Sequence, residues 1–228
     1  MTREARPEPR PLIIAHRGAS GELPEHTLEA YDRAIEQGAD YVEPDLVSTK
    51  DGVLVARHEN EIGGTTDAAS KFPDRRRTVV VDGDAVTGWF VEDFTLAELR
   101  TLRARERLAT RSQANDGRFL VPTLDEVLAL VRRRERETGR RVGVYPETKH
   151  PTYFRSIGLP LEEKLLESLR RHGYDGRDDA VFLQSFETGN LRELAKKTSL
   201  RLIQLIDDPH LPWDFRAAGD TRTVAEWI

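Results

Sequence analysis

The sequence predicts an α/β fold built on a mainly parallel sheet. From residue 123 onward, segments with helical spacing of apolar residues alternate with short apolar runs, an order typical of sheets whose strands run parallel. Thr-x-x-Glu sequences at Thr95 and Thr123 are capping boxes that mark the starts of helices. The chain has 228 residues, and α/β barrels often form a single unit of about this size.

The first predicted elements follow a polar, proline-rich leader, residues 1–11, which we expect to be disordered. Residues 12–15 are a short apolar run typical of a buried strand, which ends at His16. Apolar residues at helical spacing predict a helix over 27–37, and Gly38 is its stop signal.

A second strand is predicted over 41–47, where alternation places Glu43 and Asp45 on one face. Two carboxylates on one strand face are costly to bury without a cation. They therefore require a divalent metal ion or an arginine, and hard oxygen ligands favour magnesium or calcium over zinc. Pro44 lacks an N–H, so we expect strand pairing to be interrupted between the two acids.

Asp51-Gly52 lies between two apolar runs and is a strong signal for a two-residue hairpin turn. In that arrangement Lys50 faces Val53, and His58 lies opposite Asp45. In the alternative arrangement the two strands are parallel neighbours. The local pattern leaves both arrangements open.

Residues 61–87 show little helical or strand periodicity. A structureless connection of that length is unusual inside a compact domain unless it is functional. A helix beginning at Thr95, with Glu98 completing the capping box, ends this region. We interpret residues 62–121 as an insertion after the third strand that covers the mouth of the site.

The remaining chain alternates regularly. A helix is predicted from Thr123 to about residue 137, followed by a strand over 141–149 that places Glu147 and Lys149 on one face. The later predicted elements are a helix at 161–172, a strand at 181–186, a helix at 188–197 and a strand at 201–206. This makes about six strands, whereas a (β/α)8 barrel needs eight. Since the chain ends within an apparent helix, TVAEWI, we expect a C-terminally truncated piece of a longer protein.

Composition limits the function classes. The net charge is -5 with 33% charged residues, so no broad basic surface for nucleic acid is predicted. No window approaches the roughly 20 apolar residues of a membrane span. The absence of cysteine excludes disulfides, thiol catalysis and cysteine-bound zinc.

Three long motifs resemble the glycerophosphodiester phosphodiesterase family: HRGASGELPEHTLEAY, DYVEPDLVSTKDGVLVARHE and, as in its insertion-bearing bacterial-type branch, GWFVEDFTLAELRTLRARERL. The resemblance covers residues 12–206. It implies a TIM-type (β/α)8 barrel of the phospholipase-C-like (PLC-like) phosphodiesterase kind, here a single incomplete domain over 12–228 with about six of eight strands.

The resemblance also implies site residues, and their chemistry agrees with it. His16 and His58 would be the catalytic acid and base, a task that suits an imidazole pKa near neutrality. Arg17 and Lys149 would bind the phosphate, although Arg17 could instead neutralise the acids. The expected ligands of one Ca²⁺ or Mg²⁺ ion are Glu43, Asp45 and Glu147.

Two neighbouring pairs have weaker predicted roles. Glu25 and His26 match a family element, but a helix start with a supporting role is the preferred interpretation. Gln184 and Phe186 are candidates for lining the pocket, although core packing explains Phe186 equally well.

The implied reaction is metal-dependent hydrolysis of glycerophosphodiesters, such as glycerophosphocholine or glycerophosphoethanolamine, to glycerol 3-phosphate and an alcohol. The order of the two histidines, the metal ion, and the choice between water and the glycerol 2-hydroxyl as nucleophile stay open, as does the oligomeric state. The alternatives are a lysophospholipase D-like or phosphoinositide-type enzyme, a non-catalytic phosphoester-binding barrel, and an inactive fragment. The leader lacks the apolar segment of a secretory signal, so we expect a cytoplasmic protein, or an exported one if an upstream segment is missing.

Overall fold

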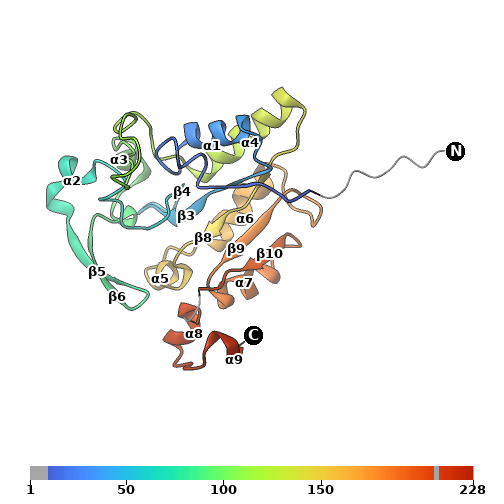
Figure 1. Cartoon of the computed structure of the whole chain (residues 1–228). Helices are drawn as coiled ribbons and strands as arrows, with labels where there is room; N and C mark the ends of the chain where they lie inside the picture. Colours follow the sequence, from blue (N-terminus) through green and yellow to red (C-terminus); the bar gives the residue numbers. More distant parts are fainter. Residues whose placement is uncertain (1–9, 208–210, 228) are drawn as a thin grey trace.

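The computed structural model describes residues 10–207 and 211–227, so most of the predicted leader lies outside the described residues. An α/β arrangement with a central parallel sheet and helices packed beside it is seen in Figure 1. This confirms the predicted fold class.

The parallel sheet has five positions, two of which are filled by two consecutive strand segments. The order of the strands in the sheet is the same as their order in the sequence. Successive strands pair in the order β1, β2 with its continuation β3, β7 with its continuation β8, β9 and β10. Their bounds are Ile14–His16 (β1), Tyr41–Glu43 (β2), Asp45–Ser48 (β3), Gly143–Val144 (β7), Glu147–Thr148 (β8), Phe182–Ser185 (β9) and Arg201–Gln204 (β10).

Pro44 separates β2 from β3, which confirms the predicted interruption between the two acids. Hydrogen bonds carry the sheet across the break. The Tyr145 N–H donates to the carbonyl of Val42 at 2.9 Å, and the Glu147 N–H donates to that of Pro44 at 3.0 Å. The side chains of Glu43 and Asp45 therefore stay on one face, as the alternation predicts.

Four helices connect successive strands, namely α1 (Leu28–Glu36), α4 (Leu124–Thr138), α6 (Glu162–Arg171) and α7 (Thr188–Ala195). They pack in a row, α1 on α4, α4 on α6 and α6 on α7. Thr123 and Glu126 form the predicted capping box of α4, and Gly139 ends this helix with a φ of 66°. Their apolar faces and the strands make one buried core.

The third predicted strand, β4 (Leu54–Ala56), runs antiparallel to β3, so the hairpin alternative is confirmed. Its predicted register is wrong by one residue. Thr49 N–H donates to Val53 O, and Gly52 has a φ of 78°, so the loop has three residues instead of two. As a result Arg57, whose N–H donates to Asp45 O at 2.9 Å, takes the place predicted for His58.

The segment between β4 and α4 is more regular than expected. It contains α2 (Ala68–Lys71), the 3₁₀ turns η1 (Pro73–Arg75) and η2 (Val91–Asp93), the hairpin β5 (Arg77–Val81) with β6 (Asp84–Gly88), and α3 (Leu96–Leu99). The Thr95 capping box is confirmed. The hairpin turn is Asp82-Gly83, with φ of 50° and 91°, which is the positive-φ pair of a two-residue turn.

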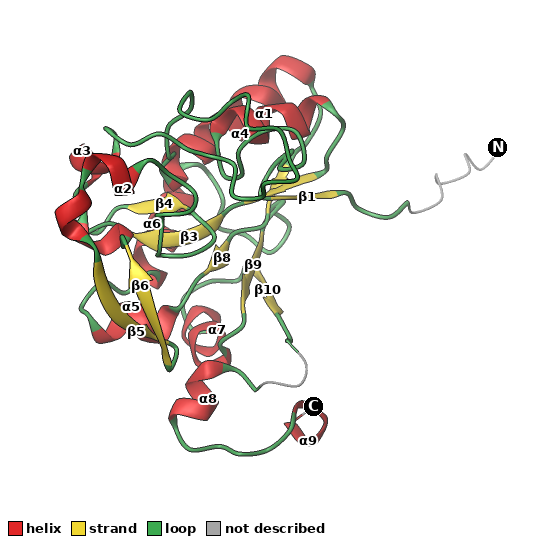
Figure 2. Cartoon of the chain, turned by 60° about the vertical axis from the view of Figure 1, so that its left-hand side comes forward, coloured by secondary structure: helices red, strands yellow, loops and turns green. Residues whose placement is uncertain are grey.

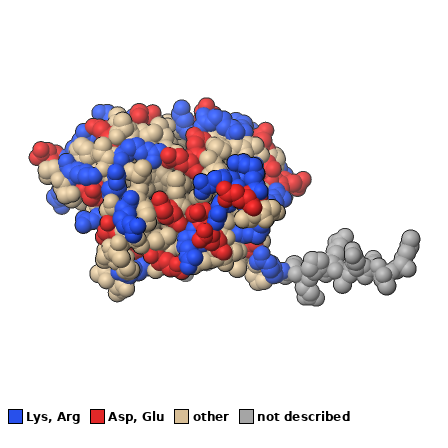
Figure 3. All heavy atoms as spheres, turned by 90° about the horizontal axis from the view of Figure 1, so that it is seen from above, with Lys and Arg blue, Asp and Glu red and all other residues tan. Residues whose placement is uncertain are grey.

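The short helices α5 (Pro151–Ser156) and α8 (Trp213–Ala217) were not predicted, whereas α9 (Val224–Trp227) lies in the apparent helix that was predicted near the end of the chain. In the part of the chain that the structure describes, no helix combines the length and apolar character that crossing a membrane requires. Basic and acidic side chains are mixed over the face shown in Figure 3.

Candidate active site

Four of the predicted site residues lie on neighbouring parallel strands of the sheet. His16, the last residue of β1, is the register partner of Glu43, the last residue of β2. Asp45 is the register partner of Glu147 on β8. The pairing of parallel strands thus brings four predicted site residues together from segments far apart in the sequence.

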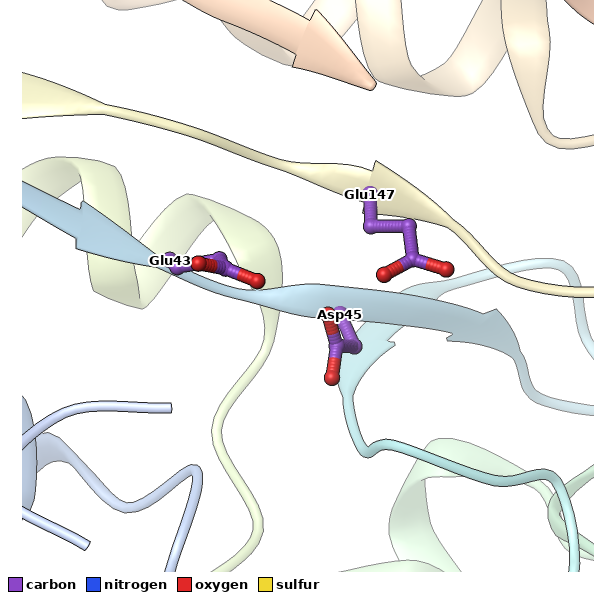
Figure 4. Close-up of side chains that lie close together, drawn as sticks. All are labelled: Glu43, Asp45 and Glu147. Atoms are coloured by element: carbon purple, nitrogen blue, oxygen red, sulfur yellow. The ribbon is translucent and has the colours of Figure 1, made fainter. Parts of the chain in front are cut away.

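Glu43, Asp45 and Glu147 form a compact acidic cluster. One oxygen of each lies within 4.8 Å of the others, and the three side chains lie close together in Figure 4. Burial and the charge of Asp45 raise the pKa of Glu43 to about 7 and that of Glu147 to about 8. The site therefore takes up protons when no cation balances its charge.

The cluster fits a divalent cation. Asp45 is fully buried, and its Oδ1 has no hydrogen-bond partner among the described residues. A buried carboxylate oxygen without a donor is costly, and a cation would satisfy it. Three carboxylates are the hard oxygen ligands that Mg²⁺ and Ca²⁺ accept.

The other oxygen of Asp45 is held by a buried relay that the sequence analysis missed. His26 Nε2 lies 3.0 Å from Asp45 Oδ2, and His26 Nδ1 lies 2.7 Å from the Tyr31 hydroxyl. Burial lowers the pKa of His26, so its ring is neutral, donates from Nε2 to the carboxylate and accepts the Tyr31 O–H at Nδ1. His26 thus holds in place Asp45, one of the predicted metal ligands.

Arg17 is nearly buried beside the same acids. Its NH1 lies 3.3 Å from Glu25 Oε2, and its Nε lies 3.5 Å from Asp45 Oδ2. Arg107, from the segment before α4, contacts the same Glu25 oxygen at 3.0 Å. The contact with Asp45 matches the alternative in which Arg17 neutralises the acids, and phosphate binding stays a prediction.

Lys149 lies next to the cluster, with its Nζ 3.1 Å from Glu147 Oε1. Burial lowers the pKa of Lys149, but the carboxylates of Glu147 and Asp45 raise it by more, so the pKa lies above its ordinary value. Together with His58 and Phe186, Lys149 and Glu147 line a cavity of about 340 Å³. This cavity holds a fixed positive charge beside the acids and is open to solvent. Gln184 is buried and donates to Tyr145 O.

The two predicted catalytic histidines differ from a core histidine such as His26. The His16 side chain is 64% exposed, with Nε2 3.9 Å from Glu43 Oε1. Loss of hydration at its inner side and the charge of Arg17 lower its pKa. The His58 side chain is 30% exposed, with Nδ1 2.8 Å from Glu59 Oε1. Both rings are therefore accessible to a ligand beside the acidic cluster.

Three further charged residues near the site, Arg57, Glu59 and His150, were not predicted. Arg57 is buried and its NH1 donates to Glu25 O at 3.1 Å. His150 lies 2.8 Å from Glu59, a residue 91 positions earlier. These residues are adjacent in sequence to His58 or Lys149, which indicated that they lie near the site. No local sequence pattern predicts a contact between residues 91 positions apart.

A family model described as the glycerophosphoryl diester phosphodiesterase family matches residues 16–225. Over 213 residues the chain is 41% identical to glycerophosphodiester phosphodiesterase GDPD6 of Arabidopsis thaliana, covering 87% of this chain and 56% of that protein. It is 38% identical to the glycerophosphodiester phosphodiesterase of Haemophilus influenzae, covering 86% of this chain and 56% of that protein. The chain thus spans little more than half the length of these relatives.

Solved structures show the same fold. A putative glycerophosphoryl diester phosphodiesterase from Silicibacter pomeroyi superposes with a TM-score of 0.68 at 23% identity, over 95% of this chain and 70% of that one. A phosphodiesterase from Oleispira antarctica, solved in complex with the product sn-glycerol-3-phosphate, gives 0.62 at 22% identity, over 92% and 71%. The arrangement of helices and strands is therefore that of solved phosphodiesterases of this kind.

Proposed function

Because the chain belongs to the glycerophosphoryl diester phosphodiesterase family, we propose that it hydrolyses glycerophosphodiesters, such as glycerophosphocholine or glycerophosphoethanolamine, to glycerol 3-phosphate and an alcohol. The observation that carries this proposal is the convergence of two accessible histidines on a buried cluster of three acids. The product bound to the Oleispira antarctica enzyme supports the substrate class.

The acidic cluster of Glu43, Asp45 and Glu147 would hold one Mg²⁺ or Ca²⁺ ion. When bound, such an ion offsets negative charge that develops on phosphoryl oxygens. His26 holds Asp45 by a hydrogen bond, and Tyr31 in turn holds His26. The carboxylate of Asp45 is therefore already oriented before an ion binds.

Arg17 and Lys149 would bind the phosphate as fixed positive charges beside the acids. The Arg17 guanidinium is held by Glu25 and Asp45, and Lys149 is held by Glu147. Because their positions are set by these ion pairs, little reorganisation is needed when the substrate enters.

His16 and His58 would move the protons. One accepts a proton from the nucleophile, and the other donates one to the departing alkoxide. The Nδ1 of His58 faces the Glu59 carboxylate, which leaves its Nε2 for the substrate. The same proposal includes residues 62–121 as an insertion at the site, since Asp82 on its hairpin contacts His150.

The test is glycerol 3-phosphate release from glycerophosphocholine by the purified chain, with Mg²⁺ or Ca²⁺ and with a chelator. Release that depends on the metal ion supports the proposal. Lysophosphatidylcholine serves as a second substrate, and faster turnover of it would favour the lysophospholipase D-like alternative. A cooperative melt followed by circular dichroism shows that the chain is folded, so absence of turnover by a folded chain would contradict the proposal.

A further inference from the structure

A continuous chain of close polar contacts joins the tip of the β5–β6 hairpin to His58. Asp82 Oδ2 lies 2.6 Å from His150 Nδ1, and His150 Nε2 lies 2.8 Å from Glu59 Oε2. The other oxygen of Glu59, Oε1, lies 2.8 Å from His58 Nδ1. The Glu59 carboxylate therefore bridges two imidazole rings, one with each oxygen. Figure 2 shows the hairpin beside α5, the helix that His150 precedes.

Two members of this chain have strained backbones. Asp82 and His150 have φ of 50° and 47°, and among the described residues only Arg17 and His26 are other non-glycine residues with positive φ. Such conformations are uncommon for residues other than glycine and persist where the surroundings enforce them. The turn itself accounts for the positive φ of Asp82, and the side chains of Asp82 and His150 are directed at each other.

The hairpin tip is also closely packed. A Cβ on Gly83 would lie 2.8 Å from the Trp213 ring, and Gly83 has a φ of 91°. The turn therefore fits closely against α8 only with glycine at this position. Asp82 is thus carried by a turn whose place is fixed on two sides, by His150 and by Trp213.

The charges fix the direction of the hydrogen bonds. Burial lowers the pKa of His150, but hydrogen bonds to Asp82 and Glu59 outweigh this effect and raise the pKa to about 9. The ring is therefore an imidazolium at neutral pH and donates from both nitrogens. A carboxylate only accepts, so the proton in the contact between Glu59 and His58 belongs to His58 Nδ1.

We propose that Asp82 and His150 are positioning residues that act through Glu59 to hold His58 with its Nδ1 protonated and its Nε2 free. His150 holds Oε2 of Glu59, so the carboxylate cannot rotate Oε1 away from His58 without losing the contact with His150. The effect of this arrangement on turnover rests on the proposed function, in which His58 transfers a proton during hydrolysis of the phosphodiester. The relay itself is independent of any substrate.

The first experiment tests the relay by nitrogen-15 NMR of the histidine side chains, assigned with a His58→Gln variant. In the wild-type chain we expect neutral His58 to carry its proton on Nδ1. His150→Leu and Asp82→Ala should shift this ring towards a mixture of tautomers, whereas Asp84→Ala, an exposed neighbour on the same turn, should not. A His58 ring that is unprotonated at Nδ1 in the wild type, or unchanged in both variants, would overturn the proposal.

The second experiment measures turnover of glycerophosphocholine. His150→Leu should lower kcat roughly 10- to 100-fold, the range expected when a group that orients a functional histidine is lost, with little change in KM. Asp82→Asn keeps an oxygen that accepts from His150 and should retain most of the kcat lost in Asp82→Ala. Wild-type kcat in a folded His150→Leu variant would refute the positioning role. A wild-type chain without turnover would contradict the proposed function instead, and the NMR result would still decide whether the relay exists.

Discussion

Asp45 and Glu147 are register partners on the neighbouring parallel strands β3 and β8, 102 positions apart in the sequence. The pairing places their carboxylates on the same face, and Glu43 joins them from the other side of Pro44. The acidic cluster is therefore a product of sheet register. A shift of one residue would turn the acids to the opposite face.

Metal affinity should depend on this cluster. Replacing Glu147 with glutamine keeps the shape of the side chain and removes one negative charge, so affinity for Mg²⁺ or Ca²⁺ should fall by at least about tenfold. Titration calorimetry measures it. Glu187→Gln is the matched control, because Glu187 is also buried and its pKa is likewise raised, to about 7, but it lies outside the cluster. Equal affinities in wild type and Glu147→Gln would place the metal elsewhere.

The two solvent-accessible histidines, His16 and His58, should be needed for turnover and dispensable for folding. His16→Gln and His58→Gln should each lower kcat/KM by about 10²- to 10⁴-fold, the usual contribution of an acid or base. Melting temperatures should change little, since the His16 side chain is 64% exposed. His172→Gln, at the end of α6 beside Asp125, is a control expected to keep full activity. Near-normal turnover in either test variant would remove that histidine from the acid/base pair.

Local signals predicted much of the fold. The capping boxes at Thr95 and Thr123 were confirmed, because capping depends on residues three positions apart. The helices α1, α4, α6 and α7 and their neighbouring strands lie close to their predicted ranges. The hairpin β5–β6 was missed although Asp82-Gly83 is a turn signal, because the flanking strands are largely exposed and do not show the apolar pattern of a buried strand.

What could not be predicted depends on contacts distant in sequence. The contact between Arg107 and Glu25 spans 82 positions, and that between His150 and Glu59 spans 91. The one-residue error that put His58 opposite Asp45 came from assuming a two-residue turn, where the chain uses three. The strand pattern placed Glu147 on the same face as Lys149, and the family resemblance assigned it as the third predicted metal ligand.

Gly18 should be essential for the loop that carries Arg17. A Cβ at this position would lie 2.7 Å from the backbone of Ala30 in α1, and its φ is 83°. Gly18→Ala should therefore lower the free energy of unfolding by about 1–3 kcal/mol, through strain and a forced shift of the loop. Denaturant unfolding measures this change. Gly21→Ala, where a Cβ meets nothing within 4 Å, should be nearly neutral, and equal effects of the two substitutions would contradict the predicted clash.

The free energy of unfolding should also depend on pH through the protonation of His150. Its pKa is raised from the model-peptide value of 6.5 to about 9 in the folded chain, so the folded state binds this proton more tightly than the unfolded state. The resulting stabilisation is fully present below about pH 6.5 and is lost as the pH rises through about 9. It amounts to at most about 3 kcal/mol.

The pH dependence of His150 can be isolated by comparing wild type with Asp82→Ala, which removes one of the two carboxylates facing the ring. The raised pKa values of Glu43 and Glu147 also make stability fall with rising pH, but this effect is common to both proteins and cancels in the difference. Urea unfolding at about pH 6 and about pH 10 should show a large difference in the free energy of unfolding at the lower pH and a small one at the higher. A difference that does not change with pH would mean that Asp82 supports the hairpin by packing and not by holding a charged His150.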